Sequence, residues 1–247
     1  MTELADLGIA CVRAHNPGPY TLSGTNTWVI GRDPAWVIDP GPALREHLDA
    51  IAAEVARRGG AGGIALTHDH ADHAEGAQAL HERLGAPLAA ARHPADVTLA
   101  DGDAFGPLHA FAVPGHADDH LVFIAGRACF TGDAVLGEGS VFVTSALASY
   151  LAALERLRER DLAVLCPGHG PPVWDPRAKL DEYVEHRLDR ERRLVEALGA
   201  GLRTRDELLG AAWPDAPPAL RGAAALTLGA HLEKLGEEGR LPDGVER

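Results

Sequence analysis

The densest group of chemically reactive side chains in the chain is the segment His68–His73, which reads His-Asp-His-Ala-Asp-His. Three histidines and two aspartates in six residues are too polar for a core, and the segment directly follows an apolar run. In a turn after a strand, His68 and His70 point to one side while Asp72 and His73 reach a neighbouring point. Imidazole and carboxylate ligands at two adjacent points favour two zinc-like ions over a merely solvated loop.

Three further candidate ligands, His116, Asp133 and His169, each lie just past the end of another apolar run. Alone, each would be an ordinary turn residue. Side chains that follow several strands of a layered α/β fold converge at one edge of that fold. The sequence therefore predicts that these three residues join the histidine-rich segment in one site.

Seven ligands are too many for one tetrahedral metal and suit two. We expect the first metal to be bound by His68, His70 and His116. We expect the second metal to be bound by Asp72, His73 and His169, with Asp133 bridging the two metals. Two metals about 3.5 Å apart can hold a hydroxide between them, which predicts hydrolysis. Asp72 would also orient this hydroxide and carry its proton. Two Zn²⁺ are preferred for such a ligand shell, although Mn²⁺ or Fe²⁺ would bind too.

Three polar residues follow His116 closely, namely Asp118, Asp119 and His120. They either position the ligand imidazoles, as carboxylates commonly do around a metal, or form a solvated turn. The residue pattern leaves both interpretations open.

Short β-rich runs alternate with helical ones over the first 175 residues, which predicts an α/β layered domain. The turn Gly31–Pro34 predicts a hairpin of two strands. Strands are expected at 27–30, 36–38, 63–66, 88–90, 108–113, 121–124, 128–130 and 163–166, and helices at 43–58, 75–84 and 149–160.

The strand signal stops at Pro176, and apolar residues then repeat at helical spacing up to Leu198 with one polar break at Glu191. Thr204, with Glu207 three residues later, predicts a capping box and a short helix. A further helix is expected at 220–235, and Gly239–Pro242 suggests a small hairpin or wing. The sequence thus predicts two domains, 1–175 for the metal site and 176–247 as a helical, winged-helix-like appendage.

Composition excludes several classes of function. The 247 residues include 36 acids and 23 bases, and residues 201–247 hold six bases against eight acids, so no segment is basic enough to hold a polyanion by charge alone. Met1–Gly8 lacks the bases of a secretory signal, and no apolar run approaches the length of a membrane span. We expect a cytoplasmic protein without a membrane partner.

The pattern His-x-His-x-Asp-His at 68–73, together with His116, Asp133 and His169, resembles the signature of the metallo-β-lactamase superfamily. This resemblance implies an αββα sandwich. Asp133 is similar to the bridging ligand of the hydrolase branch, which includes glyoxalase II and ribonuclease Z, whereas true lactamases have a cysteine there.

Four longer segments resemble the lactamase-beta-2 group within that superfamily, and they span nearly the whole chain: Asn16–Thr27, Val37–Gly41, Gly132–Gly137 and Ala230–Leu235. The group's sandwich domain is followed by a winged-helix-like tail. One departure is Ala117, where relatives often have Thr or Ser; this change should affect the surroundings of the ligands and not the ligand set.

The resemblance implies a dinuclear zinc hydrolase that acts on an ester-like bond. A phosphodiester in single-stranded RNA is the first expectation, because animal members of the group are described as endoribonucleases. The alternative is a small-molecule ester or thioester, as in glyoxalase II; the residues that would reach such a substrate, or instead form surface ion pairs, are Tyr183, Arg187, Arg190, Arg192 and Arg193. A third possibility is a non-catalytic nucleic-acid or partner-binding protein, against which the intact ligand set argues.

Overall fold

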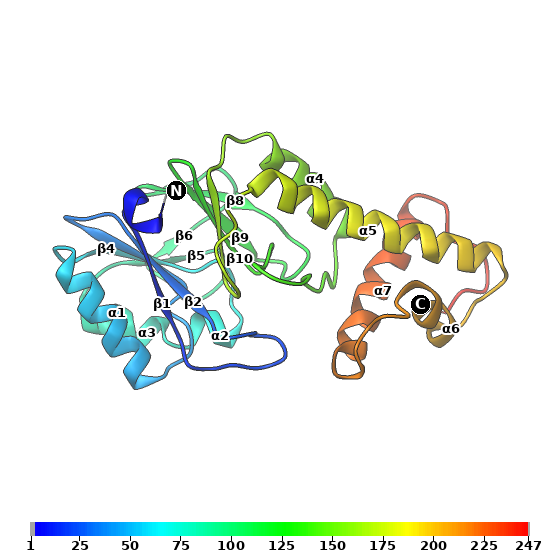
Figure 1. Cartoon of the computed structure of the whole chain (residues 1–247), viewed down its shortest axis with the longest axis horizontal. Helices are drawn as coiled ribbons and strands as arrows, with labels where there is room; N and C mark the ends of the chain where they lie inside the picture. The colour runs from blue at the N-terminus through cyan, green and yellow to red at the C-terminus, as the bar shows by residue number, and fades with distance from the viewer. Residues whose placement is uncertain (1–2, 247) are drawn as a thin grey trace. The chain divides into compact units, whose positions relative to one another are not determined.

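The computed structural model describes residues 3–246, which form two compact units (Figure 1). The first, here called the sheet unit, comprises Met1–Val113, Asp119–Gly139 and Asp161–Pro176. The second, the helical unit, comprises Pro114–Asp118, Ser140–Arg160 and Arg177–Arg247. The two units interleave along the chain, and the cut after residue 175 stays a prediction about domains.

The first sheet of the sheet unit has the order β1-β2-β3-β4-β5-β6, with antiparallel pairing from β1 to β3 and parallel pairing from β3 to β6. Its strands are β1 (Ile9–Arg13), β2 (Asn26–Ile30), β3 (Ala35–Ile38), β4 (Ala61–Ala65), β5 (Leu88–Ala90) and β6 (Val97–Thr98). The predicted hairpin is confirmed, because β2 pairs antiparallel with β3. The strand β1 was missed, as were the two-residue strands, which are too short to show a pattern.

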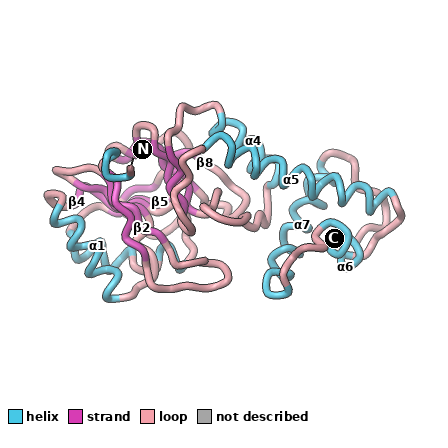
Figure 2. The backbone as a smooth tube through the Cα atoms, in the orientation of Figure 1, coloured by secondary structure: helices cyan, strands magenta, loops and turns pink. Residues whose placement is uncertain are grey.

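The second sheet has the order β11-β10-β9-β8-β7. Its strands are β7 (Ala104–Phe105), β8 (Leu108–Ala112), β9 (Leu121–Ala125), β10 (Ala128–Gly132) and β11 (Val164–Pro167). The pairs from β7 to β10 are antiparallel, whereas β10 and β11 are parallel. It follows that β8, β10 and β11 run in the same direction and end at the same edge of the sheet. Figure 2 shows the strands, in magenta, gathered in the sheet unit.

Two apolar layers hold the sheet unit together. One lies between the sheets and includes Trp28, Phe123 and Phe130, and every residue of β2 and β10 is buried because these strands are covered on both faces. The other lies between the first sheet and the helices α1 (Arg45–Arg57) and α3 (Ala77–Leu84), around residues such as Ile51 and Leu80. Each large apolar side chain so buried contributes about 1.5–3 kcal/mol before entropy is counted.

The helical unit contains α4 (Leu147–Arg158), α5 (Pro176–Gly199), α6 (Arg205–Ala212) and α7 (Arg221–Glu237). The capping box is confirmed, since Thr204 and Glu207 bond each other's side chain and backbone at the start of α6. The polar break at Glu191 is buried, and its carboxylate pairs with Lys234 and Arg240, each at 2.7 Å. The break in the apolar pattern is therefore an internal ion cluster rather than an exposed position.

Of the hairpin or wing expected to start at Gly239–Pro242, the hairpin is wrong, because no strand lies in this segment. Residues 238–246 form turns and irregular structure, and Gly239, at a positive φ of 67°, follows the end of α7 in the left-handed conformation that terminates helices. Arg240, the next residue, turns back to pair with Glu191 and Glu238. This ion cluster takes the place of a strand pairing.

Among the described residues, no helix combines the length and apolar character needed to span a membrane.

Candidate metal centre

The histidine-rich segment begins where β4 ends, and a single helical turn, α2 (Ala71–Ala74), shapes its second half. His70 is the N-cap of α2, so the first part of the segment is extended while Asp72 and His73 lie on the turn. The backbone N–H of His73 donates to the carbonyl of His70 at 2.9 Å. This change of backbone conformation within the segment separates its side chains into two sets.

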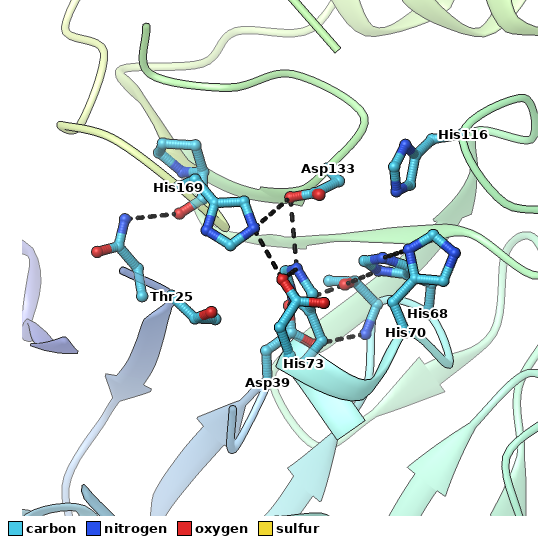
Figure 3. Close-up of polar contacts among 12 residues, drawn as sticks. Thr25, Asp39, His68, His70, His73, His116, Asp133 and His169 are labelled. Atoms are coloured by element: carbon cyan, nitrogen blue, oxygen red, sulfur yellow. Dashed lines mark hydrogen bonds and ion pairs between the residues drawn. The ribbon is translucent and has the colours of Figure 1, made fainter. Parts of the chain in front are cut away.

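The second set of predicted ligands meets at one point (Figure 3). One ligand atom from each of Asp72, His73 and His169 lies within 4.8 Å of the other two. His169 Nε2 is 3.1 Å from Asp72 Oδ2, and His73 Nε2 is 3.5 Å from the same oxygen. The structure thus brings these three side chains together, with both imidazoles fully buried.

Asp133 lies between the two sets. Its Oδ1 is 3.4 Å from Nε2 of His73 and 3.4 Å from Nε2 of His169, and it also groups with His68. Two glycines allow close packing around the centre: a Cβ on Gly132 would lie 2.5 Å from Thr67 Oγ1, and a Cβ on Gly168 would lie 2.8 Å from Asp133 Oδ1. The glycine before the aspartate and the glycine before His169 are therefore required by close packing around the centre.

The first set is ordered by a chain of hydrogen bonds. Thr67 Oγ1 donates to Asp39 Oδ2 at 2.8 Å, so its lone pair accepts from Nδ1 of His68 at 3.0 Å. Nε2 of His68 then carries no proton, and it lies 3.0 Å from Nδ1 of His70. Fixing the tautomer in this way prepares an imidazole for a metal.

The same pattern holds for the two buried imidazoles of the second set. His73 donates from Nδ1 to Asp39 Oδ2 at 2.9 Å, and His169 directs Nδ1 toward the carbonyl of Gly24 at 3.4 Å. In both rings Nε2 faces the carboxylates and makes no hydrogen bond within the described residues. Buried nitrogen lone pairs that face carboxylate oxygens without a proton between them are costly, and a cation satisfies all of them at once.

The electrostatic field at this point favours positive charge. Burial opposes protonation of His169, but the carboxylates of Asp133 and Asp72 outweigh burial and raise its pKa to about 9. Burial likewise disfavours a charged His73, yet Asp133 and Asp39 hold its pKa well above the usual value. For Asp133, burial acts in the other direction and is outweighed by the two imidazoles, so that its pKa lies well below normal. The His and Asp residues present thus fit divalent cations.

His116 belongs to the helical unit, where its Nδ1 donates to the carbonyl of Phe142 at 3.1 Å. Its place among the metal ligands stays a prediction. Of the three polar residues after it, His120 is buried, stacks on His68 with 4.7 Å between ring centroids and accepts from the backbone N–H of Asp133 at 3.1 Å. His120 therefore packs against the ligands, whereas Asp118 is exposed and accepts from Ser145.

The residues considered for substrate contact on α5 separate into two kinds. Tyr183 and Arg187 are buried, and Arg190 forms a two-pronged ion pair with Asp215 at 2.7 Å. Arg192 and Arg193 form the expected surface pairs, both with Asp189.

Two residues that the sequence analysis did not name individually, although each lies in one of the family-like segments, support the centre. Asp39 follows β3 in a left-handed conformation, with φ of 52°, and also accepts from the backbone N–H of Thr67 at 2.8 Å. Asn26 donates to the carbonyls of Pro167 and Gly170, which flank His169. The sequence signal that could have identified them is their position: Asn26 begins β2 and Asp39 directly follows β3, at the same edge of the sheet as the ligands.

Comparison with known proteins places these features in a family. Residues 20–113 and 95–169 match the model of the metallo-beta-lactamase superfamily, and residues 204–242 match the beta-lactamase associated winged helix domain. The chain is 31% identical over 257 residues to a beta-lactamase-like protein 2 homolog from Caenorhabditis elegans, an alignment that covers 96% of this chain and 86% of that protein.

Two more similarities extend this result. An atrochrysone carboxyl ACP thioesterase from Aspergillus chevalieri is 35% identical over 201 residues, covering 76% of this chain and 64% of that protein. The crystal structure of a metallo-beta-lactamase family protein from Thermus thermophilus matches with a TM-score of 0.74 and 26% identity over 94% of each chain. The chain thus belongs to the metallo-beta-lactamase superfamily, as a metal-dependent hydrolase that carries the winged helix domain associated with that family.

Proposed function

We propose that this protein hydrolyses acyl thioesters at a centre that holds two divalent metals. The observation that carries the proposal is the position of Asp133, which groups with His68 of the first ligand set and with His73 of the second. A carboxylate in such a position is suited to bridge two cations. The thioester is supported by the thioesterase from Aspergillus chevalieri.

We assign the ligands as the sequence suggests, with Zn²⁺ preferred and Mn²⁺ or Fe²⁺ as alternatives. The first metal is assigned to His68, His70 and His116, the second to Asp72, His73 and His169, and Asp133 to both. When bound, two such metals lower the pKa of a coordinated water and so supply a nucleophile near neutral pH.

Asp72 is the residue best suited to move a proton. Its side chain is 31% exposed, whereas that of Asp133 is 10% exposed, so Asp72 contacts both the centre and solvent. Burial raises the pKa of Asp72, but the neighbouring His169 and His73 outweigh burial and lower the pKa overall. The carboxylate is therefore ionised at neutral pH and able to accept a proton from the attacking water.

Hydrolysis of a phosphodiester is the second candidate, and the match of residues 204–242 to a winged helix domain favours it. The same ligand set would serve either bond, because both reactions pass through an anionic transition state. The net charge of −13 gives little attraction to single-stranded RNA. For this reason we rank the thioester first.

The test combines metal content with turnover on one preparation. Metals are measured by mass spectrometry, and substrates are an acyl coenzyme A thioester, S-lactoylglutathione, bis-p-nitrophenyl phosphate and single-stranded RNA. His70→Ala and Asp133→Ala should lose at least about a hundredfold in kcat/KM. Asp69→Ala is the matched control, because Asp69 lies in the same motif but is exposed and pairs with His93 instead.

Preferred turnover of a thioester, with about two metals bound per chain, would support the proposal. Preferred cleavage of RNA or of the phosphodiester would move the assignment to the second candidate. Protein that binds no metal and turns over none of these substrates would refute a hydrolase and favour the non-catalytic alternative.

A further inference from the structure

A second pocket lies in the sheet unit, at the start of α1 and the end of β1. Its volume is about 410 Å³. Four basic side chains line it together with a single acid; they are Arg13, His15, Arg45 and His47, with Glu46. None of these residues is among the candidate metal ligands, so the pocket is distinct from the metal centre.

The arginines of this pocket are not neutralised by the protein. Arg13 donates from Nε to the amide oxygen of Asn26 at 3.0 Å, and it has no ion pair with any described carboxylate. Arg45 has one ion pair, with Asp49 at 3.9 Å, but its side chain is 94% exposed and such a pair contributes little. Both guanidinium groups are thus available to an anion in the pocket.

The start of α1 adds backbone donors. This helix has 13 residues, and its N-cap, Leu44, has no side chain that can accept from the first turn. The first N–H groups of a helix have no partner within the helix, and together with the helix dipole they attract anions. The backbone N–H groups of Arg45, Glu46 and His47 therefore lie beside the pocket as donors.

His47 supplies the independent observation that points to a ligand. It is buried, with 5% of its surface exposed, and its Nδ1 has no hydrogen-bond partner among the residues that the structure describes. Thr27 Oγ1 gives its only proton to the carbonyl of Asp39 at 2.6 Å, so at 2.9 Å it must accept from Nε2–H of His47. In the neutral ring, which burial favours by lowering the pKa, Nδ1 is then an acceptor without a donor.

From these contacts we infer that the pocket binds a phosphate monoester group. Its ionised oxygens accept from Arg13, Arg45 and the first N–H groups of α1, and the O–H of its monoanion, which is well populated near the second pKa of about 6, donates to Nδ1 of His47. A carboxylate or a sulfate ester has acceptors only at neutral pH and would leave Nδ1 unsatisfied, at the cost of an unpaired buried polar atom. The phosphate belongs either to the substrate of the proposed hydrolysis or to a separate ligand.

A site-resolved titration tests this inference on the metal-loaded full chain at pH 6, where phosphate carries an O–H and sulfate does not. Inorganic phosphate and sulfate are added separately, and the backbone amide signals are followed by NMR. We expect the amides of Arg45, Glu46 and His47 to shift saturably, with phosphate binding about tenfold more tightly than sulfate. Arg13→Gln should weaken phosphate binding about tenfold. Arg32→Gln, the same change on an exposed turn at the other end of β2, should not.

Three results would overturn the inference: amide shifts confined to residues 67–73, equal affinity for sulfate and phosphate, or unchanged phosphate affinity in Arg13→Gln.

The source of the phosphate follows from kinetics with two substrates. An acyl coenzyme A thioester carries a phosphate monoester, whereas an N-acetylcysteamine thioester has none. A KM that rises in Arg13→Gln for the first substrate alone supports a phosphate on the substrate, and unchanged KM values with intact amide shifts support a separate ligand. Amide shifts without any thioester turnover would refute the proposed function and leave the phosphate site standing.

Discussion

At the scale of single residues, Asp39 organises both halves of the metal centre from behind. One carboxylate accepts from Nδ1 of His73, from the hydroxyl of Thr67 and from the backbone N–H of Thr67. Through that hydroxyl it also sets the tautomer of His68. Its left-handed backbone is a conformation that Asp and Asn tolerate better than most residues, and it persists because these three bonds hold it.

We expect Asp39→Asn to weaken metal binding by about 10–100-fold, because the amide keeps the size and the backbone preference but loses the negative charge behind His73. Competition with a chelating dye measures the affinity. Asp161→Asn, at a side chain that is 82% exposed and pairs with Arg127, is the control and should retain full affinity. An unchanged affinity in Asp39→Asn would show that Asp39 has no role in positioning the ligands.

A second residue-scale prediction concerns His231, which is buried against Trp213 with 5.5 Å between ring centroids. Burial, assisted by Arg187 and Lys234, lowers its pKa to about 3. The unfolded chain binds a proton near pH 6.5, so this residue costs stability as the pH falls from 6.5 to about 3, at about 1.4 kcal/mol per pH unit.

We therefore expect His231→Phe to flatten the decline of unfolding free energy between pH 6.5 and 4, as measured by urea denaturation. His109→Phe, on an exposed position of β8, should keep the wild-type slope. Parallel pH profiles for wild type and His231→Phe would contradict this account.

At the scale of elements, α5 contacts the segment that orients His116, a candidate ligand within the helical unit. The buried guanidinium of Arg187 donates from Nη2 to Ser140 Oγ at 2.9 Å and to the carbonyl of Val141. The next residue, Phe142, accepts from Nδ1 of His116. A helix outside the two sheets thus holds the segment that orients this imidazole.

Arg187→Met retains an unbranched apolar stem, although a shorter one, and removes all the donors, leaving the Val141 carbonyl without this bond. We expect about a tenfold fall in kcat/KM together with partial loss of one metal of two, because the orientation of His116 is no longer maintained. Metal content by mass spectrometry separates this effect from general destabilisation. Arg193→Met, on the exposed face of the same helix, is the control; equal metal content in both variants would argue against the link.

At the scale of the whole molecule, net charge limits the choice of substrate. The chain carries 36 acids against 23 bases, and the ionised groups of the helical unit largely pair with one another, as Arg190 does with Asp215. Affinity for nucleic acid rests mainly on cations that neutralise phosphates, and in this chain acids outnumber bases. The winged helix domain therefore lacks the usual electrostatic means of holding RNA.

We expect single-stranded RNA to bind weakly, with a dissociation constant above about 10⁻⁴ M at physiological salt, the weak end of non-specific binding. Fluorescence anisotropy with a labelled oligonucleotide measures it over a range of salt concentrations. Tight binding with a steep dependence on salt would support the phosphodiester candidate against the thioester.

The amino-acid sequence by itself determined the family, the alternation of strands and helices and the seven candidate ligands. These features are local: a six-residue motif has its own spacing, and a polar residue after an apolar run marks the end of a strand. The tail was less predictable, because the pattern at Gly239–Pro242 is compatible with a hairpin as well as with a helix end. There the decision came from Arg240, which pairs with Glu191 at 2.7 Å.

Only the tertiary structure decided which residues support the ligands and which residues form the second pocket. Asp39 reaches Thr67 across 28 positions of sequence, and Asn26 reaches Gly170 across 144. The substrate-contact interpretation of Arg187 was likewise decided by its burial against Val141. Contacts of this kind depend on how sheets and helices pack, and no local pattern encodes them, because a buried polar group is satisfied by whichever partner the fold brings near.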